Sequence, residues 1–214
     1  MSKKVSKDEA LKAVKTLNHE NPESSLQAEA MEAVKTLILW AGDNPEREGL
    51  LDTPKRVVKA YKQFFSGYND DPEEILSRTF EEVDGYDDAV IVRDIRLESH
   101  CEHHMVPIIG VAHVGYIPSN RVVGISKLAR LVDCYSKRLQ TQETMTAQIA
   151  NTIDKVLKPK GVAVVIDSNH NCMSTRGVHK THSSTITSRM LGIFRTDIKA
   201  REEFINLINS PQKF

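Results

Sequence analysis

Residues 90–120 read VIVRDIRLESHCEHHMVPIIGVAHVGYIPSN and join two apolar runs through a cluster of thiol and imidazole side chains. The first run, Val90 to Leu97, is rich in β-branched residues and partly alternates. The second covers Ile108 to Ile117 and closes at the turn Pro118-Ser-Asn. Each run predicts a β-strand. Because the two strands follow one another in the chain, an antiparallel hairpin is the favoured pairing.

The segments on either side of this hairpin predict a mixed α+β fold. Apolar residues recur at helical spacing both before and after it, behind capping residues and prolines that mark helix starts. Helices are expected to begin at the capping box Ser24/Gln27, at Thr53-Pro54, at Asp71-Pro72, at Ser126 and at Gln142, with a last one around Phe204. Further strands are expected over Val162–Ile166 and in a Thr/Ser-rich run that ends at Phe194. Strands in consecutive pairs favour antiparallel hairpins over a doubly wound sheet.

Composition narrows the class of protein. Among 214 residues, Lys plus Arg total 29 and Asp plus Glu total 29, and this balance argues against a general nucleic-acid binder. No stretch approaches the roughly 18 uninterrupted apolar residues of a membrane span, and the N-terminus lacks the apolar core of a secretory signal. Three cysteines do not suggest a disulfide framework. We therefore expect a cytoplasmic protein with no nucleic-acid or membrane partner.

Two short segments concentrate the ligands that zinc prefers. Cys101 and His104 have C-x-x-H spacing in the hairpin loop, and Cys172 follows the predicted strand Val162–Ile166. Catalytic zinc takes three protein ligands of this kind and keeps one position open. The alternative is that these residues are core cysteines and loop histidines, since free cysteine is among the most buried residue types. For Cys134, which lies beside apolar helix positions, that alternative is the better one.

Two further histidines, His103 and His170, adjoin the candidate ligands and are free to act as acid and base. Water on a metal ion, flanked by two imidazoles, is a common arrangement for hydrolysis. If either histidine instead completed a four-ligand site, the zinc would be structural. Spacing alone leaves both possibilities open.

Several cationic residues could bind an anion. Ser126, Lys127 and Arg130 begin a predicted helix, where backbone N–H groups and positive charge suit a phosphate. Arg176 follows the second ligand segment, and Arg56 lies on an earlier helix. Any one of them alone would be interpreted as a solvated surface cation, and their clustering around the metal segments is what favours a phosphate site.

Gln142 and Glu143 open the helix after this cluster. A carboxylate can accept two hydrogen bonds from the N1–H and amino group of guanine. It can equally be an ordinary acid that the helix dipole favours at an N-terminus. Composition does not choose between these two roles.

Four segments resemble the signature segments of the GTP cyclohydrolase I family and occur in that family's order. They are Cys101-Glu-His-His, Gly124-Ile-Ser-Lys-Leu-Ala-Arg130, Arg138-Leu-Gln-Thr-Gln-Glu143 and His170-Asn-Cys-Met-Ser-Thr-Arg-Gly177. The resemblance runs from about Ala30 to Ile208, which is nearly the whole chain. Four separate motifs make it highly specific.

The resemblance implies a role for each candidate residue. It implies zinc on Cys101, His104 and Cys172, with His103 and His170 as acid/base residues. It also implies further catalytic residues Ser126 and Gln142, a guanine anchor at Glu143, and a triphosphate clamp made by Lys127, Arg130, Arg176 and Arg56. The implied reaction converts GTP to 7,8-dihydroneopterin triphosphate with release of formate, the first step of pterin biosynthesis.

The resemblance also implies a tunnelling fold, in which paired antiparallel strands of several subunits close a barrel with helices outside. It implies a homodecamer of two stacked pentamers, with each pocket at a subunit interface. The expected parts of the chain are a variable tail (1–25), a helical region (26–84) and a catalytic tunnelling-fold domain (85–214).

Three other classes of zinc-binding protein are alternatives. A structural zinc module would use four protein ligands. Zinc nucleobase deaminases carry H-x-E with P-C-x-x-C, and no P-C-x-x-C occurs in this chain. Tunnelling-fold enzymes that resemble pyruvoyl-tetrahydropterin synthases hold zinc with histidines alone, whereas two cysteines are candidates here.

Overall fold

The computed structural model describes residues 22–81 and 85–211. The chain divides into two compact units at the boundary between Gln63 and Phe64, and each unit is described by itself. Most of the predicted variable tail lies outside the described residues, and the predicted division into three parts stays a prediction. Within the described ranges, no helix combines the length and the apolar character needed to cross a membrane.

The N-terminal unit is helical. Helix α2 (Pro22–Trp40) is followed by the 3-10 helix η1 (Glu48–Leu50) and by α3 (Thr53–Phe64). The start of α3 at Thr53 agrees with the prediction, because proline fits the first helical turn, where its missing N–H is not needed. Helix α2 already includes Ser24, so the predicted capping box at that residue is wrong.

The C-terminal unit is built on a five-stranded sheet in the order β5-β2-β3-β6-β7. Its strands are β2 (Val90–Cys101), β3 (Pro107–Ile117), β5 (Leu139–Gln140), β6 (Gly161–His170) and β7 (Thr185–Gly192). All neighbours pair antiparallel except β5, which lies parallel to β2. The predicted hairpin, the second strand pair and the α+β class are confirmed. Strand β6 extends beyond the predicted Ile166 because its polar end continues the ladder with β3.

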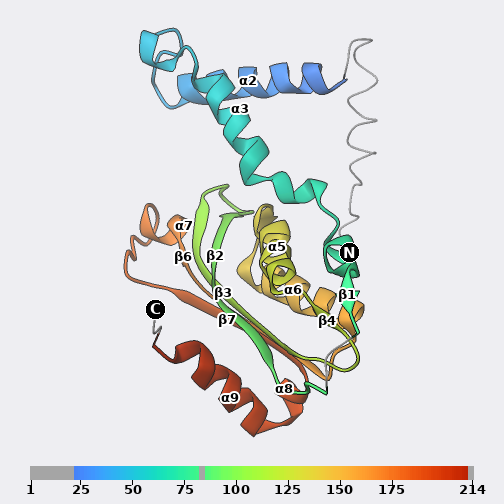
Figure 1. Cartoon of the computed structure of the whole chain (residues 1–214). Coiled ribbons are helices and arrows are strands. Elements are labelled where there is room, and N and C mark those ends of the chain that lie inside the picture. The colour runs from blue at the N-terminus through green and yellow to red at the C-terminus, as the bar shows by residue number, and fades with distance from the viewer. Residues whose placement is uncertain (1–21, 82–84, 212–214) are drawn as a thin grey trace, which may run out of the picture. The chain divides into compact units, whose positions relative to one another are not determined.

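Helices cover both faces of this sheet (Figure 1). One face packs against α4 (Pro72–Ser77), α5 (Ile125–Ser136) and α6 (Gln142–Leu157), and Val164 contributes to that core. The other face packs against α8 (Ile193–Thr196) and α9 (Ile198–Asn209), and Val165 contributes there. Neighbouring residues serve opposite cores because side chains alternate along a strand. Antiparallel strand pairs with helices packed on them confirm the predicted fold class, the tunnelling fold.

Elements of two to four residues were not predicted, because they are too short to show a periodicity. They are η1, η2 (Ser66–Asn69), the pair β1 (Thr79–Phe80) and β4 (Val122–Val123), β5, α7 (Asn171–Ser174) and α8. Two further predicted boundaries are wrong. Gly124, not Ser126, is the N-cap of α5. Strand β7 ends at Gly192, whose φ of 57° turns the chain, so Phe194 lies on α8.

Candidate metal centre

Strand register brings the three candidate ligands to one end of the sheet. His100 pairs with Pro107 across the β2–β3 hairpin, and Ile108 pairs with His170 on β6. Cys101 is the last residue of β2, and the short helix α7 starts directly after β6. Because antiparallel ladders align these strand ends, residues about 70 positions apart in sequence become neighbours.

The hairpin loop folds back on the end of β2. The N–H of Cys101 donates to the carbonyl of Val106 at 2.9 Å, and the N–H of Met105 donates to the carbonyl of Cys101 at 2.8 Å. Met105 has a φ of 54°, the left-handed conformation that lets a tight loop reverse. This turn returns the imidazole of His104 toward the Cys101 sulfur.

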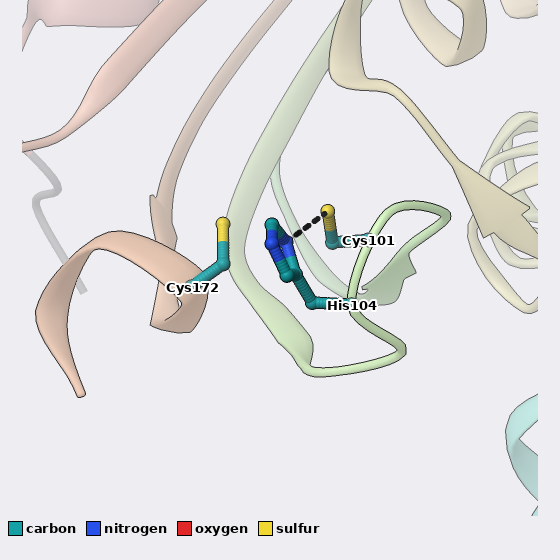
Figure 2. A group of neighbouring side chains, drawn as sticks. All are labelled: Cys101, His104 and Cys172. Carbon is teal, nitrogen blue, oxygen red and sulfur yellow. Dashed lines mark hydrogen bonds between the residues drawn. The ribbon is translucent and has the colours of Figure 1, made fainter. Parts of the chain in front are cut away.

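Cys101, His104 and Cys172 converge at this end of the sheet (Figure 2). One ligand atom from each lies within 4.8 Å of the other two, and Cys101 Sγ is 3.9 Å from His104 Nδ1. A tetrahedral zinc ion with bonds of about 2.0–2.3 Å holds its ligand atoms about 3.4–3.8 Å apart. The group could therefore hold a metal ion after small side-chain shifts, and two thiols with one imidazole are donors that zinc prefers.

The electrostatics of the group suit a cation. Burial, and then the neighbouring Cys101, raises the pKa of the Cys172 thiol, while Arg176 acts in the opposite direction. Two adjacent sulfurs resist ionising together, and a metal ion between them would reverse that preference. Cys101 is 5% exposed, so one ligand is shielded from water while His104 is exposed.

His103 and His170 lie beside this group without belonging to it. His103 Nδ1 is 3.7 Å from Cys101 Sγ, and His170 Nε2 is 2.7 Å from Gln142 Oε1. Burial lowers the pKa of His170, against the charge of Glu143, so the neutral ring is favoured at pH 7. Three protein ligands would leave a tetrahedral ion one open position. The acid/base roles of the two histidines stay predictions.

Arg176 and Glu143 approach the same region from two elements. Nη1 of Arg176 is 2.7 Å from Nε2 of His104. Glu143 lies in the first turn of α6, whose cap Thr141 accepts the N–H of Thr144. Its side chain lines a cavity of about 240 Å³ together with Thr146, Ala147, Thr187, Ser188 and Arg189. A carboxylate, an arginine and several hydroxyl groups thus line this cavity, and the charge of Glu143 also acts on His170.

The other predicted phosphate-binding residues lie on two helices, α5 and α3, that contribute no ligand to this group. Ser126, Lys127 and Arg130 lie in the first half of α5, the helix that follows β3 and β4 in the chain. The C-terminal end of α5 leads into β5, the strand that pairs with Cys101. A helix of 12 residues is about 18 Å long. Arg56 belongs to the N-terminal unit, where an aspartate one turn earlier pairs with it at 3.0 Å.

Two buried polar residues at this end of the sheet escaped the sequence interpretation. Ser168 is 2% exposed, and its Oγ donates to Gln142 Oε1 at 2.7 Å. His100 is 7% exposed and stacks on Phe64 with ring centroids 4.7 Å apart, and its Nδ1 has no hydrogen-bond partner among the described residues. In the sequence, each of these two residues is only a polar residue beside an apolar run. That pattern does not tell which side chain it will contact.

Comparison with known proteins gives consistent matches over most of the chain. The model of the family described as GTP cyclohydrolase I matches residues 30–209. A protein of Hyphomonas neptunium named GTP cyclohydrolase 1 is 61% identical over 181 residues, which cover 85% of this chain and 88% of the relative. Relatives of the same name from Maricaulis maris and Brucella anthropi are 60% and 57% identical, over 84% and 90% of this chain and 88% and 89% of their own.

A search of solved structures finds the archaeosine synthase QueF-Like in its apo form. It has a TM-score of 0.41 and 20% sequence identity, and the match covers 49% of this chain and 93% of that one.

Proposed function

We propose that this chain, which belongs to the GTP cyclohydrolase I family, is an enzyme that converts GTP to 7,8-dihydroneopterin triphosphate and formate. The observation that carries the proposal is the convergence of Cys101, His104 and Cys172, with His103 and Arg176 beside them. This chemistry would serve as the first step of pterin biosynthesis.

The metal ion that we propose for this group is Zn²⁺, held by Cys101 Sγ, His104 Nδ1 and Cys172 Sγ. When bound, zinc would supply a Lewis acid that lowers the pKa of water. Two thiolates and one imidazole are soft and borderline donors, which favours zinc over magnesium or calcium. The same donor set distinguishes this site from histidine-only sites.

His103 and His170 would move the protons. Hydrolysis at C8 of guanine needs an acid for the adjacent N7, and His103, which lies against the Cys101 sulfur, would give that proton. The opened ring then loses its C8 carbon as formate in a second hydrolysis. Ribose opening and rearrangement need a base that returns its proton later, and the neutral ring of His170 suits this step.

The remaining predicted residues would hold the substrate. Glu143, at the cavity, would accept the N1–H and amino protons of guanine. Arg176 lies nearest to the ligand group and would bind phosphate oxygens, as would Lys127, Arg130 and Arg56. Ser126 would contact the sugar or phosphate region.

Lys127, Arg130 and Arg56 would come from a neighbouring subunit. We propose a homodecamer of two pentamers with pockets at subunit interfaces. Two features of the single chain support shared pockets. The start of α5 lies at the opposite end of the helix from β5 and Cys101. Within the described sheet, β7 is an edge strand, paired with β6 alone, so another subunit's strand could extend the sheet there.

The direct test is turnover. Metal-replete protein incubated with GTP should release formate in equal amount to a pterin, detected by fluorescence after oxidation. His103→Ala should keep its bound metal and lose formate release by about 100-fold or more, the range of general acid catalysis. If the wild-type protein released no formate from GTP, the proposal would fail. If His103→Ala lost the metal instead, His103 would be a ligand.

A further inference from the structure

Gln142 is 1% exposed, and its side-chain amide forms four hydrogen bonds inside the protein. Its Nε2 donates to the carbonyl oxygens of Ile166 at 3.0 Å and Thr185 at 2.8 Å. Its Oε1 accepts the hydroxyl of Ser168 at 2.7 Å and lies 2.7 Å from Nε2 of His170. One helix and two strands therefore meet on a single side chain.

These partners determine the orientation of the amide. A backbone carbonyl can only accept, so both carbonyls require the NH₂ group of Gln142 to face them. The reversed amide would place an oxygen against two carbonyl oxygens, so repulsion would replace two hydrogen bonds. The oxygen of Gln142 must therefore be the atom that faces Ser168 and His170.

The orientation of the amide determines the tautomer of His170. Oε1 of Gln142 can only accept, so the ring nitrogen 2.7 Å away, Nε2, must carry a proton. In a neutral imidazole, one nitrogen carries the proton and the other carries a lone pair. The lone pair of His170 then resides on Nδ1.

We propose that Gln142 is a positioning residue, which holds the ring of His170 through its Nε2–H and so leaves Nδ1 as the ring nitrogen available to the reaction. The assignment to the reaction rests on the proposed function, whereas the tautomer itself does not.

This role differs from the direct catalytic contact that the resemblance implies for Gln142. Both of its N–H donors and both lone pairs of its oxygen are already used by protein partners, which leaves no capacity for a substrate atom. Its backbone is held as well, because Thr146 Oγ1 donates to the carbonyl of Gln142 at 2.7 Å and also contacts Thr187 Oγ1 at 2.7 Å.

The tautomer can be observed directly. Neutron diffraction from crystals of the full-length protein, exchanged into deuterated solvent, should show deuterium on Nε2 of His170 and two deuterons on Gln142 Nε2 that face Ile166 and Thr185. Deuterium on Nδ1 with none on Nε2 would overturn the proposal. This measurement needs no turnover, so it is independent of whether the protein acts on GTP.

Kinetics test the role in the reaction, with Ser168→Ala as the matched control. Gln142→Leu removes the acceptor of His170 and should lower kcat about 100-fold while KM for GTP changes by less than about twofold. Ser168→Ala removes a bond to the same oxygen without touching His170, and kcat should stay within about threefold of wild type.

A conservative variant separates positioning from simple core support. Gln142→Glu keeps an oxygen that accepts from His170 but sets its other oxygen against the carbonyls of Ile166 and Thr185. It should therefore lose stability, while its kcat exceeds that of Gln142→Leu by about tenfold or more. If Gln142 only supported the core, Gln142→Glu would be as inactive as Gln142→Leu, and Ser168→Ala would be impaired too. That pattern would overturn the proposal, and if Gln142→Leu failed to fold, the position of the deuterium on His170 would decide it.

Discussion

The three cysteines of this chain differ in what surrounds their sulfur atoms. Cys101 and Cys172 lie close to one another and to the imidazole of His104. Cys134 is fully buried on α5, and its Sγ accepts from Nη2 of Arg138 at 3.1 Å. Burial raises the pKa of the Cys134 thiol, which keeps it protonated and unsuited to a metal. Surroundings, not residue type, therefore separate a candidate ligand from a core residue.

Removal of one sulfur should release the metal. Cys172→Ser replaces a thiolate by a hydroxyl that ionises far less readily, so zinc affinity should fall about 100-fold or more. Elemental analysis of purified protein and titration with a zinc chelator would measure the loss. Cys134→Ser is the matched control, because it makes the same change outside the group and should retain its zinc. Equal zinc content in both variants would contradict the ligand assignment.

At the level of elements, the close approach of β3 and β6 sets the position of the ligand-bearing strand end. A Cβ on Gly110 would lie 2.1 Å from the carbonyl oxygen of Asp167 and 2.5 Å from Cα of Ser168. Both contacts are with backbone, which cannot move without displacing β6. Because His170 and α7 follow within a few residues, a shift of β6 here would reach the candidate site.

Gly110→Ala should therefore disturb the fold and the site together. Overpacking of this kind costs about 1–3 kcal/mol of unfolding free energy, and displacement of α7 should weaken zinc binding as well. Gly124→Ala is the control, since a Cβ there meets nothing within 4 Å. Urea unfolding and zinc titration of both variants would test the prediction. A Gly110→Ala protein with wild-type stability would contradict the prediction, because it would show that β3 and β6 can move apart at this position without cost.

A buried histidine links the β2 bulge to the neighbouring strand. The ladder between β2 and β3 shifts between Val92 and Ile95, and Asp94 in this bulge has a φ of 57°. The N–H of Asp94 donates to Nδ1 of His113 at 3.2 Å, and His113 is 8% exposed. Burial, with a smaller contribution from Arg93, lowers the pKa of His113 from 6.5, while the carboxylates of Asp94 and Asp167 oppose the shift.

The sign of this shift predicts acid sensitivity. The unfolded chain takes up the proton more readily than the folded one, so His113 contributes stability above about pH 6.5 that is lost as pH falls toward its lowered pKa. One proton limits the slope to about 1.4 kcal/mol per pH unit. His113→Asn keeps an acceptor near Asp94 but cannot titrate. Urea unfolding between pH 7.5 and 5.5 should show a shallower loss in that variant, and identical slopes would contradict the prediction.

At the scale of the whole molecule, the ligand group and the cationic start of α5 follow opposite ends of β3. The ligand group lies where β2, β3 and β6 meet at one end of the sheet, and Lys127 lies near the start of α5, which begins after the other end of β3. A pocket at a subunit interface would combine the ligand end of one chain with the cationic helix start of another. Closed symmetry repeats such a pocket at every interface.

Complementation between two inactive variants tests shared pockets. His103→Ala and Lys127→Ala change opposite halves of the proposed pocket, and each alone should be nearly inactive. Coexpressed in equal amounts, they should recover up to about a quarter of wild-type activity, since random mixing makes one pocket in four intact. Sedimentation of the mixed sample would report the oligomer. If mixed oligomers formed and stayed as inactive as their parents, each pocket would belong to a single chain.

The sequence by itself determined the elements with strong periodicity and the local ligand spacing. The β2–β3 hairpin, β6, and the helix that Gln142 opens follow from patterns within 10 to 16 neighbouring residues. Cys101 and His104 are three positions apart, so one loop can present both. These features depend on local chemistry, which a sequence displays directly.

Beyond the ligand set that the family resemblance implied, only the tertiary structure decided which distant residues meet. The register of β3 with β6 brings Cys172 beside Cys101, and the end of β6 brings Ser168 and His170 onto Gln142. No local pattern in the sequence encodes the register of β3 with β6. That register results from burying the apolar side chains on both faces of the sheet against helices at the same time. The tautomer of His170 is decided at this level too, by backbone carbonyls whose positions no residue type reveals.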